Sequence, residues 1–85
     1  MSNENRIVPA GAFDAILAEI AAERERQIAK GHTAEIDDAL PPLELRHRAR
    51  NRLTHKASRQ ELIEAAALLI AELQRIERAK LVQSG

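Results

Sequence analysis

Apolar side chains recur at helical spacing from Ser58 to about Val82, and this pattern predicts one long helix. The stripe predicted as the core face consists of Leu62, Ala66, Leu69, Leu73 and Ile76. A second stripe beside it consists of Ile63, Ala67 and Ile70, and Leu68 falls in the remaining polar arc. A helix that is apolar this far round has to be covered on more than one side. The rest of the chain offers one other good amphipathic helix, so the sequence predicts cover from another copy of the protein.

Local signals mark where helices start and stop. The predicted elements are helices over about 12–30, 42–55 and 59–82, a loop over 31–40 and a loose N-terminus over 1–10. Lys30-Gly31 is typical of a helix end, because the glycine can adopt a left-handed conformation. Pro42 suits a first helical position. Ser58 and Glu61 have the spacing of a capping box, which fixes the start of the last helix.

The composition favours a small helical core. The chain has 85 residues, one Phe and no Trp, Tyr or Cys. Its core therefore consists of Leu, Ile and Ala, since sheets favour aromatic and β-branched residues. A chain this short is near the size at which a single hydrophobic core is marginal. We predict one all-α domain over 1–85: two long antiparallel helices plus a shorter basic helix, assembled as a homo-oligomeric helical bundle.

The sequence offers no sign of a membrane or of export. Glu64 and Glu72 interrupt the apolar run of the last helix, which is shorter than the roughly 20 residues that span a bilayer. The N-terminal residues contain no hydrophobic segment of a signal peptide. The absence of Cys excludes disulfides and thiolate metal sites. A cytoplasmic protein is expected.

Charge is unevenly distributed although the formal net charge is zero. Residues 46–59 hold six Lys or Arg, two His and no acid, whereas residues 1–45 hold nine acids and four bases. Arg46 and Arg50 share a helix face with Leu53, which predicts that they turn toward the body of the protein. Guanidinium groups suit phosphate. The alternative is a solvated basic face that pairs with the acidic first half. Nucleic acid is an unlikely ligand, because only Phe13 can stack on a base.

Arg24 lies in the middle of the apolar face of the first helix, with Gln27 at its edge. A guanidinium directed at a core needs an anionic or carbonyl partner, because an unpaired buried charge is very costly. One candidate is an ion pair within or between subunits, for example with Glu72 or Glu77. The other is an anionic ligand in a cleft between helices.

These observations give one set of ligand-binding residues and one alternative metal set. The predicted ligand-binding residues are Arg24, Gln27, Arg46, His47, Arg50 and Arg52. The arginines would contact phosphate, and the Gln and His would orient it. No catalytic residue and no cofactor are predicted. Under the alternative interpretation Mg²⁺ is held by clustered carboxylates, namely Glu23, Asp37, Asp38, Glu61 and Glu64.

Two stretches resemble small, mostly uncharacterised bacteriophage helical proteins. Residues 16–38, ILAEIAAERERQIAKGHTAEIDD, contain E-R-x-R-Q, a glycine and T-x-E-x-D-D, and residues 61–79, ELIEAAALLIAELQRIERA, resemble the closing helix of those proteins. The same pairing occurs in MazG-like phage proteins, an all-helical family that hydrolyses nucleoside triphosphates to pyrophosphate with Mg²⁺. That superfamily holds the metal with E-E-x-x-E and a later E-x-x-D. Glu61 to Glu64 can stand for the second element, with Glu in place of Asp, and the first has no match.

The resemblance implies a phage origin, the cytoplasm of a bacterial host and a nucleotide-related ancestry. We expect a phage accessory protein that binds, and thereby sequesters, a nucleotide-like or other phosphorylated anion without catalysis. The incomplete metal set disfavours an enzyme. One alternative is a Mg²⁺-dependent MazG-like pyrophosphohydrolase, and another is a protein-interaction module that inhibits a host defence protein. The expected partners are other copies of the chain and either a small phosphorylated ligand or a host protein.

Overall fold

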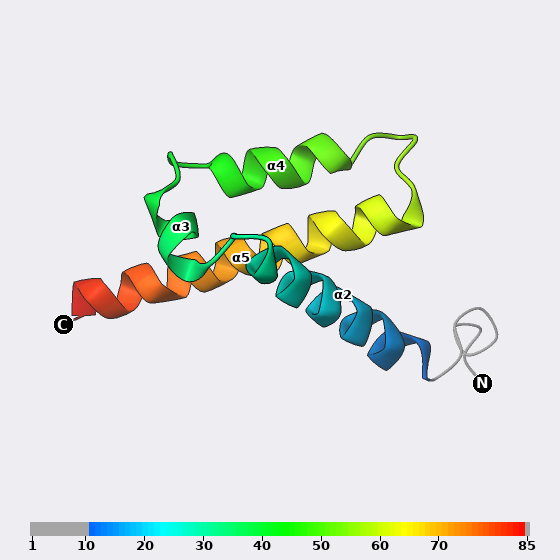
Figure 1. The fold of residues 1–85 in the computed structure, drawn as a ribbon, viewed down its shortest axis with the longest axis horizontal. Coiled ribbons are helices and arrows are strands. Elements are labelled where there is room, and N and C mark those ends of the chain that lie inside the picture. Colours follow the sequence, from blue (N-terminus) through cyan, green and yellow to red (C-terminus); the bar gives the residue numbers. More distant parts are fainter. Residues whose placement is uncertain (1–10, 85) are drawn as a thin grey trace, which may run out of the picture.

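The computed structural model describes residues 11–84, and the predicted loose N-terminus, 1–10, lies outside them. Figure 1 shows an all-helical chain in this part, which confirms the predicted fold class. The helices are α2 (Ala12–Ala29), α3 (Ala34–Ala39), α4 (Glu44–Arg52) and α5 (Arg59–Ser84). Within residues 11–84, no helix combines the length and the apolar character that crossing a membrane would require.

The start of α5 and the end of α2 are where the sequence predicts them. The Glu61 backbone N–H donates to Ser58 Oγ at 3.1 Å, and the Ser58 N–H donates to Glu61 Oε1 at 3.0 Å, which completes the capping box. Hydrogen bonding of the Glu61 carboxylate with the backbone N–H and then the side chain of Ser58 lowers the pKa of Glu61. Gly31 follows α2 with φ of 116°, a left-handed conformation that favours glycine.

Two local predictions are wrong. The predicted loop over 31–40 contains the short helix α3, because the Thr33 side chain caps it by accepting from the Ile36 N–H at 3.3 Å. The second helix is shorter than the predicted range 42–55, since α4 begins only at Glu44 and ends at Arg52. Leu43, which precedes it, has φ of 70° and therefore cannot continue a right-handed helix.

The helices are arranged around α5, which contacts each of the other three. In Figure 1, α4 runs antiparallel to α5, whereas α2 crosses α5 obliquely and runs in the same general direction. The prediction that the two long helices are antiparallel is therefore wrong. The reason is topological: the chain turns back once into α4 and again into α5, so the third long segment returns to the direction of the first.

The core lies between α4 and α5 and contains few large side chains. Its buried residues are Leu45, Ala49, Ala65, Leu68 and Ala71. Alanines on both helices allow them to approach closely. Leu68, predicted to lie in the polar arc, is only 3% exposed.

The predicted core stripe of α5 is exposed instead. Leu62, Leu69 and Leu73 are 49%, 43% and 58% exposed. The acids of the opposite arc explain this difference, because two of them pair with arginines of α4. Arg46 Nε donates to Glu72 Oε2 at 2.6 Å, and Arg52 Nε donates to Glu64 Oε1 at 3.1 Å. The polar arc of α5 thus faces α4 together with Leu68, and the leucines of the predicted stripe face outward.

Candidate ligand-binding site

A cavity of about 400 Å³ lies between α2, α4 and α5. It is lined by Glu23, Gln27, Lys30, His32, Arg48, Arg52, Glu64 and Leu68. The volume lies within the range of small-molecule sites. Seven of the eight lining side chains are polar or ionisable, so the cavity suits a charged or strongly polar ligand. We call it the α2–α4–α5 cavity.

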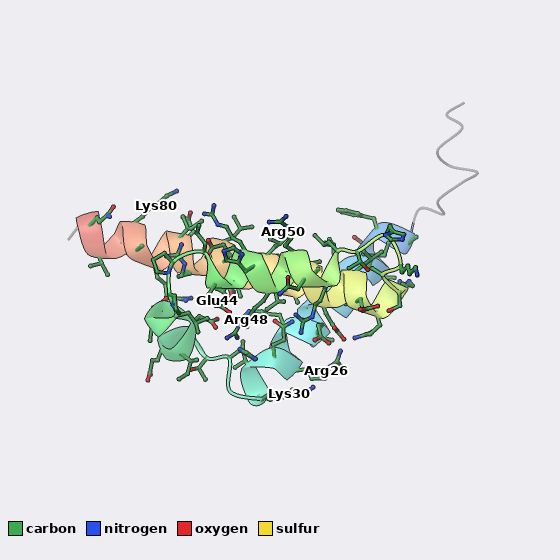
Figure 2. The ribbon with its side chains drawn as sticks, turned by 90° about the horizontal axis from the view of Figure 1, so that it is seen from above. Arg26, Lys30, Glu44, Arg48, Arg50 and Lys80 are labelled. Atoms are coloured by element: carbon green, nitrogen blue, oxygen red, sulfur yellow. The ribbon has the colours of Figure 1, made fainter. Side chains whose placement is uncertain are left out.

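The guanidinium groups in this cavity keep unused donors. Arg52 donates through Nε to Glu64 and through Nη1 to the Arg48 carbonyl at 3.1 Å. Arg48 donates through Nε to Glu44 Oε2 at 2.9 Å. Within residues 11–84, Nη2 of Arg52 and both Nη atoms of Arg48 have no acceptor. Figure 2 shows Arg48 on the side of α4 that faces the end of α2, where Lys30 lies, and Arg50 on the opposite side.

Two acids share the same cavity and are held by amides. The Gln60 side chain donates to Glu23 Oε1 at 3.4 Å and to Glu64 Oε2 at 3.3 Å. Glu23 also forms an ion pair with Arg26. Both carboxylates therefore have cationic partners, Arg26 for Glu23 and Arg52 for Glu64. The three cations of the lining (Lys30, Arg48 and Arg52) outnumber its two acids.

Gln27 lines the cavity and contains a buried, unpaired acceptor atom. It is 7% exposed, and its Nε2 donates to Glu23 Oε2 at 3.4 Å and to the Glu64 carbonyl at 3.3 Å. Its Oε1 is buried and accepts no hydrogen bond, and Nδ1 of His32 is also buried without a partner. Buried polar atoms of this kind are costly unless something satisfies them. A ligand carrying an N–H or O–H group would satisfy Gln27.

The predicted ligand-binding residues do not form one cluster. Gln27 and Arg52 line the α2–α4–α5 cavity together. Arg24 lies deeper, between α2, α3 and α5. The remaining three lie on the exposed side of α4 and are Arg46, His47 and Arg50.

The face of α4 that points inward differs from the predicted one. Leu45 and Ala49 are buried, whereas Leu53 is exposed. Arg50, which shares the face of Leu53, therefore points away from the core, whereas Arg46 lies at the edge of the contact between α4 and α5 and pairs with the buried Glu72. Burial of Leu45 and Ala49 together removes more apolar surface from water than burial of Leu53 alone would.

Three cavity residues were missed in the prediction: Lys30, His32 and Arg48. A signal for Arg48 is present in the sequence. Arg48 and Arg52 each follow an apolar residue of α4 (Leu45 and Ala49) by three positions, which places them beside the buried face. No comparable signal exists for His32, because its position depends on how the segment after α2 folds onto α5.

Arg24 is satisfied within the chain. It is 6% exposed, and its Nη2 donates to Asp37 Oδ2 at 3.1 Å. Its Nε donates to Gln74 Oε1 at 3.1 Å, and its Nη1 donates to the His32 carbonyl at 3.3 Å. The expected internal ion pair is thus present, but its acid is Asp37 and not Glu72 or Glu77. This pair joins α2 to α3, and the Gln74 contact joins both to α5.

The five carboxylates of the alternative metal set are dispersed. Glu23 and Glu64 line the cavity, Asp37 pairs with Arg24, Asp38 pairs with Arg78 and Glu61 caps α5. Among residues 11–84, no group of three or more His, Asp or Glu side chains is placed to hold a metal ion.

No known protein family, curated protein or solved structure matches this chain. The likeness to MazG-like phage proteins stays an expectation from two short stretches.

Acid is expected to destabilise the fold, because ion pairs or capping bonds lower the pKa of four carboxyl groups. Arg59 lowers the pKa of Glu19, and Arg78 lowers the pKa of Asp38. Ser58 lowers the pKa of Glu61. The pKa of Glu72 is lowered mainly by Arg75 and, to a smaller extent, by Arg46. A depressed pKa stabilises the folded state fully above the unfolded value, and this contribution is lost as the pH falls through the folded value. We expect the thermal midpoint to fall as the pH drops below about 4.5, the ordinary pKa of Glu. Thermal melts followed by circular dichroism from neutral to acidic pH would check this, and a constant midpoint would contradict it.

Proposed function

We propose that this protein binds a small phosphorylated anion, nucleotide-like in chemistry, in the α2–α4–α5 cavity, without catalysing its conversion. The observation that carries the proposal is that residues with unused guanidinium donors and a glutamine with a buried, unpaired amide oxygen line one cavity. The donors belong to Arg48 and Arg52, and the oxygen is Gln27 Oε1. The binding function predicted from the sequence is kept, with a changed set of residues.

The cationic end of the cavity suits phosphate. Arg48 and Arg52 lie one turn apart on α4, so their free N–H groups can reach the same anion. Lys30 lines the same cavity and adds a third cation. An ordinary carboxylate would satisfy fewer of these donors than the several oxygens of a phosphate.

Gln27 favours a ligand with a donor group away from its phosphate. An exocyclic amine of a nucleobase, or a sugar hydroxyl, supplies such a donor. Inorganic phosphate would fill the cationic end but leave Gln27 Oε1 without a partner. We therefore expect nucleoside phosphates to bind more tightly than phosphate alone, since each satisfied buried polar atom stabilises the complex.

Catalysis is left out of the proposal because the candidate carboxylates are dispersed. The homo-oligomer predicted from the sequence is kept in it, since a large apolar stripe of α5 is exposed in a single copy. Sequestration of a host nucleotide by a phage protein would be one use of such binding.

Titration calorimetry with mono-, di- and cyclic nucleotides and with inorganic phosphate tests the proposal. We expect binding of at least one nucleotide, weakened about tenfold or more by Arg52→Ala, since hydrogen bonds to charged groups are worth about 1.5–3 kcal/mol. Arg50→Ala is the matched control. It removes the same charge from the same helix, but its side chain points away from the cavity.

Other outcomes would overturn the proposal. Absence of heat with every ligand removes it, and equal losses from Arg50→Ala and Arg52→Ala would move the site to the outer side of α4. Release of pyrophosphate from a nucleoside triphosphate in the presence of Mg²⁺ would favour the hydrolase alternative. Capture of one specific host protein, with no small molecule bound, would favour the interaction module.

A further inference from the structure

The apolar stripe of α5 has the spacing of a coiled-coil seam. Its members follow one another at intervals of four, three, four and three residues: Leu62, Ala66, Leu69, Leu73 and Ile76. Intervals of this kind place side chains on one line along a helix that packs against a second helix, with knobs entering holes. We call this line the α5 seam.

Within residues 11–84, no helix covers the three leucines of the α5 seam, whereas Ala66 and Ile76 are half-buried. The buried residues of α5 lie off this line, Ile63 and Ala67 on the stripe beside it and Leu68 on the arc that packs against α4. The three leucines of the seam are all about half exposed. A groove of about 290 Å³ extends this apolar surface from α5 to α2, with Leu17 and Ile20 on its α2 side.

The first half of α2 belongs to the same bare surface. Phe13, Ile16 and Leu17 are exposed. In Figure 1 this half, drawn in blue, projects away from α5 beyond the point where the two helices cross. An aromatic and two aliphatic side chains on a projecting helix have a strong tendency to pack against another apolar surface.

The balance between core and surface indicates a partner that is always present. Thirteen large hydrophobic side chains are exposed in residues 11–84, whereas the large buried ones are Leu45, Ile63 and Leu68. A chain of this size with so few large core residues gains little stability from its own core. A second copy is produced whenever the chain is produced, so it can provide permanent cover.

We propose that a second copy packs on the α5 seam, with the two α5 helices antiparallel around a two-fold axis between Ala66 and Leu69. This deepens the oligomeric part of the proposed function and does not involve the ligand cavity. Leu69 then meets Ala66 of the second copy, and Leu62 meets Leu73. A two-fold contact must be self-complementary, and a large side chain opposite a small one satisfies this.

The charges at the two ends of the seam favour the antiparallel orientation. Arg59 stands three residues before Leu62, and Lys80 stands four residues after Ile76, so both continue the seam spacing. A parallel pair would place Arg59 against Arg59 and Lys80 against Lys80, which is repulsive. In the antiparallel pair, Arg59 lies opposite Ile76, and neither Arg59 nor Lys80 faces its own counterpart. Within one copy Arg59 pairs with Glu19 and Lys80 with Glu77, so the antiparallel orientation is favoured because it avoids contact between like charges.

Cysteine crosslinking tests both the contact and its direction, because the chain contains no Cys of its own. Leu62→Cys, labelled with ¹⁵N, is mixed with unlabelled Leu73→Cys and treated with a thiol crosslinker that spans one helix–helix distance, about 8–10 Å. Mass spectrometry then separates mixed from self-linked dimers. We expect mixed dimers to predominate, because in an antiparallel pair two Leu62 positions lie about 16 Å apart along the axis.

A cysteine on the exposed side of α4 serves as the control for the crosslinking experiment. Asn51→Cys, on the exposed side of α4, is expected to crosslink at most weakly, and light scattering is expected to give twice the 9.4 kDa mass of one chain. A monomer at all concentrations would overturn the proposal. Predominant self-linking, or equal linking of Asn51→Cys, would also overturn it. The nucleotide titration can succeed or fail independently of these results.

Discussion

Replacing Arg24 by methionine is expected to lower the free energy of unfolding by about 3–5 kcal/mol, the usual cost of removing one partner from a buried ion pair. Asp37, the partner, has no exposed surface. Its Oδ1 already lacks a hydrogen bond, so the variant would leave the whole carboxylate unpaired in the interior. Gln74 and the His32 carbonyl would lose their donor as well. Urea unfolding followed by far-UV circular dichroism would measure the loss, since the chain has no Trp or Tyr for fluorescence.

Two further variants separate this effect from a general effect of losing an arginine. Arg50→Met makes the same chemical change at an exposed position of α4 and is expected to alter stability by less than about 0.5 kcal/mol. The double variant Arg24→Met with Asp37→Leu removes both charges and is expected to recover most of the loss. If Arg24→Met were as mild as Arg50→Met, the Arg24–Asp37 pair would not be buried in solution.

Features set by neighbouring residues could be predicted from the sequence. The capping box of Ser58 and Glu61 and the glycine stop after α2 both appear in the structure. Each depends on a hydrogen bond or a backbone angle within a few residues, so no tertiary information is needed. Thr33 is an instructive omission, because it caps α3 by the same chemistry, yet a helix of six residues produces no apolar periodicity.

The arrangement of helix faces could not be predicted in this way. The seam of α5 has the stronger apolar pattern, but the core lies on the arc that contains Leu68, Glu64 and Glu72. Ion pairs to Arg46 and Arg52 of α4 lie on the buried arc beside the apolar cluster of Leu45, Ala49 and Leu68. A periodic apolar stripe shows that one face of a helix tends to be buried. It does not show whether the same chain or a second copy buries it.

Only part of the candidate site could be predicted, because the sequence does not show which face of α4 packs against α5. Gln27 was singled out at the edge of an apolar face, and Arg52 because it lies in the basic segment, and both line the cavity. The pattern with Leu53 predicts that Arg46 and Arg50 turn toward the body of the protein. Arg46 does reach α5, where it pairs with Glu72, but Arg50 lies on the outer side of α4, and Arg48 and Arg52 line the cavity instead.

Neighbouring leucines of α5 allow the face assignment to be tested by the same substitution. Leu68→Ala is expected to cost about 2–5 kcal/mol of unfolding free energy, because Leu68 is buried against α4 and its truncation leaves a cavity. Leu69→Ala removes the same atoms one residue later, at a position that is exposed in a single copy. In the dissociated chain it is expected to cost less than about 1 kcal/mol.

The protein concentration separates the two effects further. Leu69→Ala is expected to weaken the contact between copies. The unfolding midpoint of this variant should therefore lie below that of the unchanged chain at high protein concentration and approach it when both proteins are dilute enough to be monomers. Leu68→Ala is expected to remain destabilised at every dilution, because the contact it weakens lies within one chain. Urea unfolding at several protein concentrations, with sedimentation to follow dissociation, would distinguish them. If Leu69→Ala were as costly as Leu68→Ala in the monomer, the seam would lie in the core of each chain.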